Sequence, residues 1–115
     1  MRFLFLLTQI EEAWEKAPPG EAERVYEQYL AIERELRAQD KFVESVRLRS
    51  RNEAKTLRNL AESRRKLVDG PCFDLEEAIG GFYVLDCTSM EEAVEWAGRM
   101  PNYGHGAIEI RPLWE

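Results

Sequence analysis

The turn at positions 69–71 holds the first candidate for chemistry in this sequence. Its residues are Asp69, Gly70 and Pro71. A carboxylate in a cleft serves as a general acid or base, because burial shifts carboxyl groups toward neutral pKa values. The same residue types also make a structural turn, since aspartate caps its own backbone, glycine adopts unusual dihedral angles and proline fixes φ. Both interpretations of Asp69 stay open at this point.

An acidic cluster follows the turn. It consists of Asp74, Glu76 and Glu77. Such a cluster extends a polar pocket or holds a cation, but a charge run in a loop is usually solvated, and hard cations need a more defined oxygen geometry. We therefore predict no metal site and no cofactor, and we keep Glu77 as a candidate substrate-binding residue.

His105 lies between two glycines, where we expect an exposed and flexible loop. Histidine titrates near neutral pH, so His105 is a second and weaker candidate for a general acid. The two cysteines, Cys72 and Cys87, show neither a disulfide framework nor metal-ligand spacing. We expect both to be small buried apolar residues of a reduced, cytoplasmic protein.

Three further side chains are candidates for binding a substrate. Arg111 would hold an anionic group in a bidentate fork, or would pair with Glu109 in a structural ion pair. Tyr83 and Tyr26 would supply hydroxyl groups. Aromatic residues at such positions are more often part of the core, but those of a long helix and a central strand also line pockets between helix and sheet.

The composition bounds the class of protein. The chain has 115 residues, which predicts one domain over positions 1–115. It is 44% hydrophobic and 33% charged, which excludes a disordered chain. The net charge of −6 disfavours generic binding to nucleic acids and anionic membranes. The longest apolar run, at positions 3–7, is too short to span a membrane.

The charge is unevenly distributed. Positions 41–68 carry nine basic and three acidic residues, a net +6, and the remainder carries −12. Three interpretations stay open: a solvated surface, a counterpart for the acidic surface of a partner subunit, or a nucleic-acid patch. The last is the weakest, because aromatic residues do not alternate with the basic ones and the overall charge opposes it.

The elements that position these residues follow from hydrophobic periodicity and turn signals. We predict a strand at 2–8, a helical turn at 11–17, a long helix at 21–39, extended segments at 42–48, 55–60 and 65–68, a strand at 81–86, a helix from a Ser89–Glu92 capping box to Pro101, and a strand at 106–112. A helix over 53–66 is an equal alternative for the middle segments. The order is the split βαβ pattern of a ferredoxin-like α+β domain.

Residues 69–87, DGPCFDLEEAIGGFYVLDC, resemble the DGPF branch of the YCII-related family. The matching positions are Asp69, Gly70, Pro71, Glu77, Gly80, Gly81, Phe82 and Tyr83. A second family signature, E-x-R-P, is similar to positions 109–112, and Glu95-Trp96-Ala97 also resembles the family. Cys72, Asp74 and Glu76 depart from the motif, which has Phe, Glu and Lys there. The early histidine of a His–Asp pair proposed for some relatives is absent, so that chemistry does not carry over.

The resemblance implies a ferredoxin-like βαββαβ fold with extra hairpin strands, assembled as a dimeric α+β barrel. It also favours extended strands over a helix in the middle segment. The function that we predict is binding of a small molecule by a homodimer, in a cleft between sheet and helices near Asp69; whether it is an enzyme stays open. The alternative is a non-enzymatic interaction or regulatory module that docks a partner through positions 41–68, with nucleic-acid binding as a weaker option. We expect no membrane association.

Overall fold

The computed structural model describes residues 1–59, 61–101 and 105–115. Its helices and strands are β1 (Arg2–Ile10), α1 (Glu11–Glu15), α2 (Glu21–Ala38), β2 (Phe42–Arg47), β3 (Lys55–Arg58), β4 (Lys66–Asp69), β5 (Glu77–Asp86), α3 (Met90–Arg99) and β6 (Ile108–Pro112). One short 3₁₀ turn, Arg51–Glu53, precedes β3, and another, Glu62–Arg64, lies between β3 and β4. No helix among the described residues is both long and apolar enough to cross a membrane.

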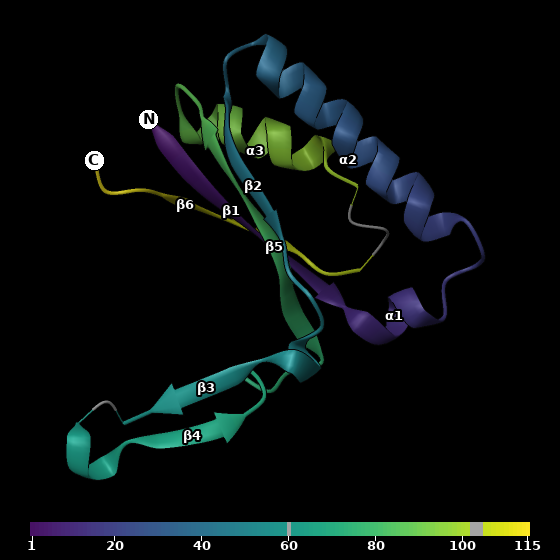
Figure 1. Ribbon diagram of the computed structural model, residues 1–115. Helices are drawn as coiled ribbons and strands as arrows, with labels where there is room; N and C mark the ends of the chain where they lie inside the picture. Colours follow the sequence, from purple (N-terminus) through teal and green to yellow (C-terminus); the bar gives the residue numbers. More distant parts are fainter. Residues whose placement is uncertain (60, 102–104) are drawn as a thin grey trace.

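Four strands form one antiparallel sheet in the order β2-β5-β1-β6. Helices α2 and α3 both lie on one face of this sheet, and the two chain termini lie near each other at the same end (Figure 1). The central strands β1 and β5 each pair with a neighbour on both edges, so their backbone groups are hydrogen-bonded within the sheet. The predicted ferredoxin-like α+β fold is confirmed.

The core lies between this sheet and the two helices. Five side chains are almost completely enclosed: Phe3, Phe5, Leu36, Leu85 and Cys87. The α2 stripe contributes Ile32 and Leu36, and α3 contributes Ala93 and Trp96. Cys87 is buried as predicted, whereas the expectation of a buried Cys72 is wrong. Cys72 is exposed because it follows the turn outside the sheet, where no helix covers it.

Strand β5 is longer than the predicted 81–86, because the glycine pair is a bulge inside the strand and not its boundary. Leu7 pairs with Gly81 and Thr8 pairs with Ile79, so Gly80 is the extra residue. At Gly81, an added Cβ atom would lie 2.6 Å from the Val46 carbonyl oxygen. Glycine is required there because β2 approaches the β5 backbone at contact distance.

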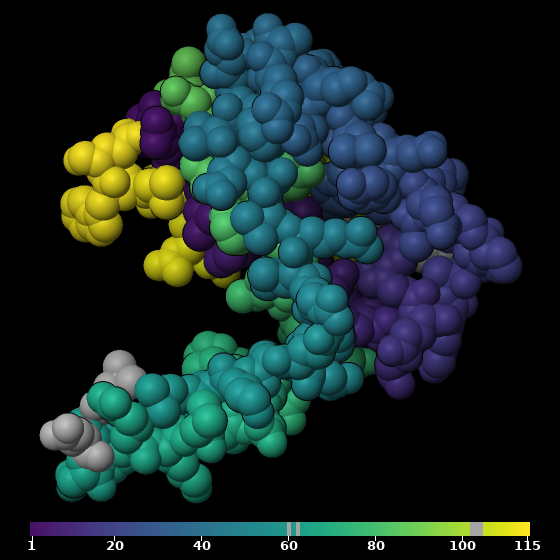
Figure 2. Space-filling model, in the orientation of Figure 1, coloured from purple at the N-terminus to yellow at the C-terminus, as the bar shows by residue number. Residues whose placement is uncertain are grey.

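Strands β3 and β4 form a separate hairpin, here called the arm. Their register runs from Lys55 opposite Asp69 to Arg58 opposite Lys66. The alternative of a helix over 53–66 is therefore wrong; Asn59 adopts a positive φ of 53°, which interrupts a helix and starts the turn back. Position 60, the predicted end of the first arm strand, lies outside the described residues. The arm projects from the end of the sheet on the side away from the helices (Figures 1 and 2).

Candidate functional site

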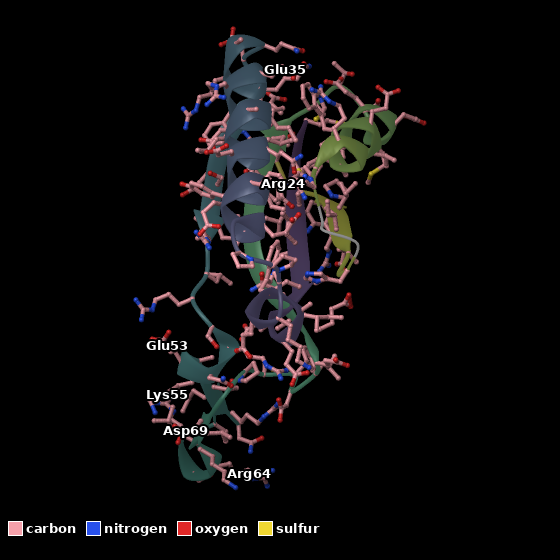
Figure 3. All side chains as sticks on the ribbon, turned by 90° about the vertical axis from the view of Figure 1, so that its right-hand side faces the viewer. Arg24, Glu35, Glu53, Lys55, Arg64 and Asp69 are labelled. Atoms are coloured by element: carbon pink, nitrogen blue, oxygen red, sulfur yellow. The ribbon has the colours of Figure 1, made fainter. Side chains whose placement is uncertain are left out.

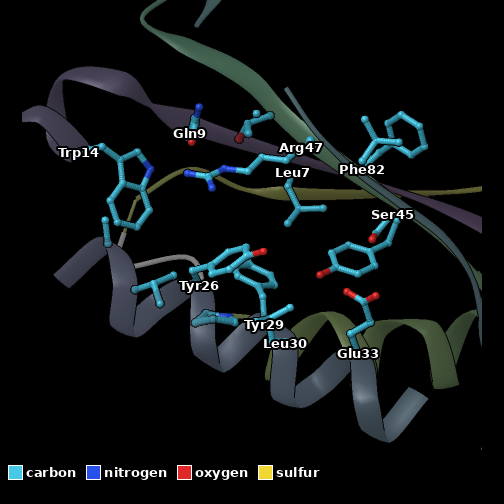
Figure 4. A pocket seen from close by; sticks show the side chains of 18 of the residues that line it. Leu7, Gln9, Trp14, Tyr26, Tyr29, Leu30, Glu33, Ser45, Arg47 and Phe82 are labelled. Carbon is cyan, nitrogen blue, oxygen red and sulfur yellow. The ribbon is translucent and has the colours of Figure 1, made fainter. Parts of the chain in front are cut away.

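A cavity of about 440 Å³ lies between α2 and the facing surface of the sheet (Figure 4). This volume is in the range of small-molecule sites. Helix α2 lines it at six positions, and the spacing of three or four between most of them places one helix face toward the sheet. They are Ala22, Val25, Tyr26, Tyr29, Leu30 and Glu33. The opposite wall comes from the ends of β1, β2 and β5, and Trp14 of α1 lies at one end.

The rings of Tyr29 and Tyr83 meet between α2 and β5 and form part of the cavity wall. Tyr29 and Tyr83 stack with their centres 6.1 Å apart and an angle of 19° between the planes. Phe42 contacts Tyr83 edge-on at 6.5 Å, so the Tyr83 ring is held from two sides. Offset and edge-on aromatic pairs stabilise such an arrangement beyond the apolar area that they bury. The cavity therefore has a rigid aromatic wall.

Burial raises the pKa of Tyr83 to about 12, with the charge of Glu33 and the neighbouring Tyr26 acting in the same direction. Burial, and then the nearby Tyr83, raise the pKa of Tyr29 further above its ordinary value of 10. Both hydroxyl groups are therefore neutral throughout the physiological pH range. Each one is suited to donate or accept a hydrogen bond, and not to act as a base.

Two charged side chains reach the cavity from opposite walls. Glu33 of α2 is bound by Arg37 one turn along the helix, at 2.9 Å between Nη2 and Oε1. The Arg47 guanidinium of β2 lies over the Tyr26 ring, with its carbon 5.5 Å from the ring centre. Within the described parts of the chain, no carboxylate pairs with Arg47. At the cavity wall Glu33 is thus paired within its own helix, whereas Arg47 is exposed to solvent and is not paired with a carboxylate.

His105 lies in the cavity wall and is packed, which corrects the expectation of an exposed loop residue. Its Nδ1 accepts a hydrogen bond from the Ile10 amide at 3.2 Å, and its ring meets Trp14 edge-on at 5.3 Å. Because Nδ1 is an acceptor, the proton of the neutral ring is on Nε2. The chain approaches closely here: an added Cβ at Gly106 would lie 2.2 Å from the Thr8 carbonyl oxygen.

The structure brings together only some of the candidate residues from the sequence. Tyr26, Tyr83 and His105 line the cavity. Glu77 is exposed at the start of β5, and Arg111 is exposed on β6, with its Nε 3.8 Å from Glu109 Oε2. In the sheet register Arg111 lies opposite Leu4, on the face that points away from α2.

Asp69 ends strand β4 on the arm and does not line this cavity. Its side chain is 87% exposed and pairs with Lys55 at 2.5 Å. Figure 3 shows both residues on the arm, apart from Arg24 and Glu35 of α2. Asp69 instead borders a second depression of about 440 Å³ on the arm, together with Thr56, Cys72 and Asp74. The cleft between sheet and helices exists, but the motif carboxylate points to solvent.

Sequence reasoning missed Glu33, Ser45 and Arg47 as cavity residues. The signal for them is alternation: Ser45 and Arg47 are two apart on β2 and therefore share the face opposite to Glu44 and Val46. The register places Ser45 beside Tyr83 and Arg47 beside Gly81. No group of three or more histidine, cysteine or acidic side chains among the described residues is arranged to hold a metal ion.

Comparison with known proteins gives two similarities. The model of the YCII-related domain matches residues 1–115, and so spans the cavity and the arm alike. An uncharacterized protein of Rhizobium meliloti (strain 1021) is 34% identical over 106 residues, which cover 90% of this chain and 82% of the relative.

Proposed function

This chain belongs to the YCII-related domain family, and we propose that it binds a small molecule in the cavity between α2 and the sheet. The observation that carries the proposal is a preformed space of about 440 Å³ with an aromatic wall. Neutral hydroxyl groups of Tyr29 and Tyr83 and the side chain of Ser45 converge on it. Apolar walls with a few convergent polar groups are the usual form of such sites.

The packing of the wall supports binding over a purely structural role for these residues. Tyr83 is fixed by Tyr29 and Phe42, and Arg37 lies over the Phe42 ring at 3.9 Å. A ligand therefore meets side chains that are already ordered, so that little conformational entropy is lost on binding. An acid–base reaction in this cavity would fall to His105 or Glu33. The proposal of Asp69 as acid or base concerns only a molecule bound against the arm.

The proposal is tested with the dye 1-anilinonaphthalene-8-sulfonate, whose fluorescence rises in apolar sites. We expect one bound dye per chain. The variant Ser45→Phe fills the cavity from β2 and should reduce the affinity at least tenfold, whereas the matched variant Thr56→Phe, which lies at the depression of the arm, should leave it unchanged. Absence of binding by the folded wild type, or equal binding by Ser45→Phe, contradicts the proposal.

The other face of the sheet favours a second proposal, a homodimer. Residues that lie opposite each other in the register place five apolar side chains on the face without helices: Leu4, Leu6, Val46, Phe82 and Val84. The arm projects on the same side and leaves a hollow between itself and the sheet (Figure 2). A second copy of this chain fits because the surface is self-complementary: the segment 41–68 carries +6 and the remainder −12.

Analytical ultracentrifugation of the whole chain tests the homodimer. Val84→Glu on the open sheet face should give monomers, and Val94→Glu on the exposed side of α3 should leave the assembly unchanged. If the arm contributes its charge, the dimer should also weaken as salt rises. A wild type that sediments as a monomer contradicts the dimer and favours the alternative, an interaction module that docks another partner.

A further inference from the structure

We propose that the ligand of this cavity is an aromatic or conjugated molecule with a single anionic group of the carboxylate class, and that Arg47 binds this group. The inference rests on the proposed function, since it names the chemistry of the molecule that the cavity takes. Three features of the structure carry it: Arg47 has no carboxylate partner among the described residues, Glu33 is paired with Arg37, and an aromatic surface lies between them (Figure 4).

Arg47 and the exposed Arg34 of α2 both lack a carboxylate partner among the described residues, but Arg47 lines the cavity and Arg34 does not. Arg24, Arg37 and Arg99 each bind a carboxylate of their own helix or of a neighbouring helix: Glu21, Glu33 and Glu35. Arg47 has no such partner among the described residues and instead extends from β2 across the cavity, above Tyr26. A guanidinium at a cavity mouth with open donors is suited to a planar carboxylate, which it binds through two parallel hydrogen bonds.

The backbone around Arg47 keeps this side of the cavity open. In the sheet register Arg47 lies beside Gly81, and the Leu48 amide donates to the Gly80 carbonyl oxygen at 2.9 Å. Neither glycine has a side chain that would stand between the guanidinium and the cavity. Gly81 therefore leaves Arg47 without a side-chain neighbour on β5, while the Gln9 side chain fills the space beside Gly80.

The charge of Glu33 does not offset the charge of Arg47. The Glu33 carboxylate is bound by Arg37, and its side chain is only 19% exposed. The local balance therefore favours an incoming anion over a cation. A single guanidinium also favours one negative charge over several, because the chain as a whole is negative and repels polyanions at long range.

The tyrosine rings of the cavity determine which chemistry the uncharged part of the ligand has. Tyr26 lies under the guanidinium, and Tyr29 and Tyr83 continue the aromatic surface toward Glu33 and Ser45. A flat, conjugated molecule stacks on such rings at little entropic cost. Its far end meets neutral hydroxyl groups, which hydrogen-bond a ligand hydroxyl or carbonyl. The geometry therefore fits an aromatic acid better than an aliphatic acid or a sugar.

Two dyes with the same aromatic skeleton test the inference. 1-Anilinonaphthalene-8-sulfonate carries one negative charge, and N-phenyl-1-naphthylamine lacks it. We expect the wild type to bind the anionic dye about tenfold or more tightly than the neutral one, since hydrogen bonds to charged groups contribute that much. In Arg47→Met this preference should disappear. The matched variant Arg49→Met, whose parent side chain is 85% exposed and bound to Glu53, should retain it.

The same experiment distinguishes the two proposals. If both dyes bind the wild type with equal affinity and Arg47→Met changes neither, the anionic ligand class is wrong while the cavity remains a binding site. If neither dye binds, the proposed function itself fails. Competition by trans-cinnamate, but not by cyclohexanecarboxylate, would further support the aromatic acid, and equal competition by both acids would overturn the aromatic part of the inference.

Discussion

The cavity and the arm are opposites in how they hold polar groups. In the cavity, tyrosine hydroxyls are held by ring packing, and burial raises their pKa values. On the arm, Asp69 and Lys55 pair in solvent, with side chains 87% and 63% exposed. The Asp69-Gly70-Pro71 part of the family motif therefore lies on the arm, where water screens the charge of its carboxylate. Of the two desolvated tyrosines, Tyr83 is a matching position at the other end of the motif, and Tyr29 belongs to no motif.

The largest expected difference between the two regions is in apolar packing. Leu85 is fully buried beneath the helices. Leu85→Ala should lower the unfolding free energy by about 2–5 kcal/mol, because a cavity remains in the core. Leu67 on the arm is 63% exposed, and Leu67→Ala should cost less than about 0.5 kcal/mol. Urea unfolding at low protein concentration measures both values. Similar costs would mean that the arm is covered.

The next effect concerns the close approach of β2 and β5. Gly81→Ala would place a methyl group against the Val46 carbonyl and should destabilise the fold by about 1–3 kcal/mol. The change should also weaken dye binding, because it displaces the strand that carries Ser45 and Arg47. Gly98 of α3 is the matched control: its Cβ position is open, and Gly98→Ala should stabilise the helix by about 0.5–1 kcal/mol.

The Lys41–Glu92 ion pair beside α3 is less exposed than the Lys55–Asp69 ion pair of the arm. Glu92 accepts hydrogen bonds from Lys41 and from the Thr88 hydroxyl and amide, which lower its pKa to about 2. Both side chains of the Lys41–Glu92 pair are only about one-fifth exposed. This carboxylate begins α3, where the helix dipole favours a negative charge.

The lowered pKa of Glu92 predicts a stability that depends on pH. The contribution is complete above the unfolded value of about 4.5 and is lost as the pH falls from there through about 2. Glu92→Gln should therefore cost about 1 kcal/mol at pH 7 and very little at pH 2. Denaturant unfolding at both pH values measures the difference. An equal cost at both would show that packing, and not charge, makes Glu92 important.

Elements with a strong periodic pattern were predicted closely from the sequence. The α2 stripe and the run of apolar residues in β1 place both elements within two residues of their observed bounds. The cap of α3 is also confirmed in part, since Ser89 Oγ accepts from the Glu92 amide at 3.2 Å. The Glu92 carboxylate, however, reaches the Thr88 amide and not that of Ser89, because Lys41 and the Thr88 hydroxyl hold it there.

The arm and the cavity were harder to predict for different reasons. The leucines near the arm suit a helix or a hairpin, and the choice depends on the cross-strand pairs and on Asn59. The cavity depends on the register between β2 and β5, which brings Arg47 beside Gly81. Register is a property of two strands and follows from a bulge that no single segment shows. Sequence reasoning therefore identified Tyr26 and Tyr83 but not Arg47, the cation above Tyr26.

The smallest expected effect belongs to the motif carboxylate itself. Asp69→Asn removes an exposed ion pair with Lys55, which should change the unfolding free energy by less than about 0.5 kcal/mol, since water and salt screen such pairs. Dye binding in the cavity should remain at the wild-type value, because Asp69 does not line it. A loss of dye binding in Asp69→Asn, with the fold intact, would connect arm and cavity and would place the arm of one copy against the cavity of another. Retained binding leaves the Asp69-Gly70-Pro71 motif with the structural role of its turn, in which Gly70 adopts a φ of 100° and its amide bonds the Ala54 carbonyl at 2.8 Å.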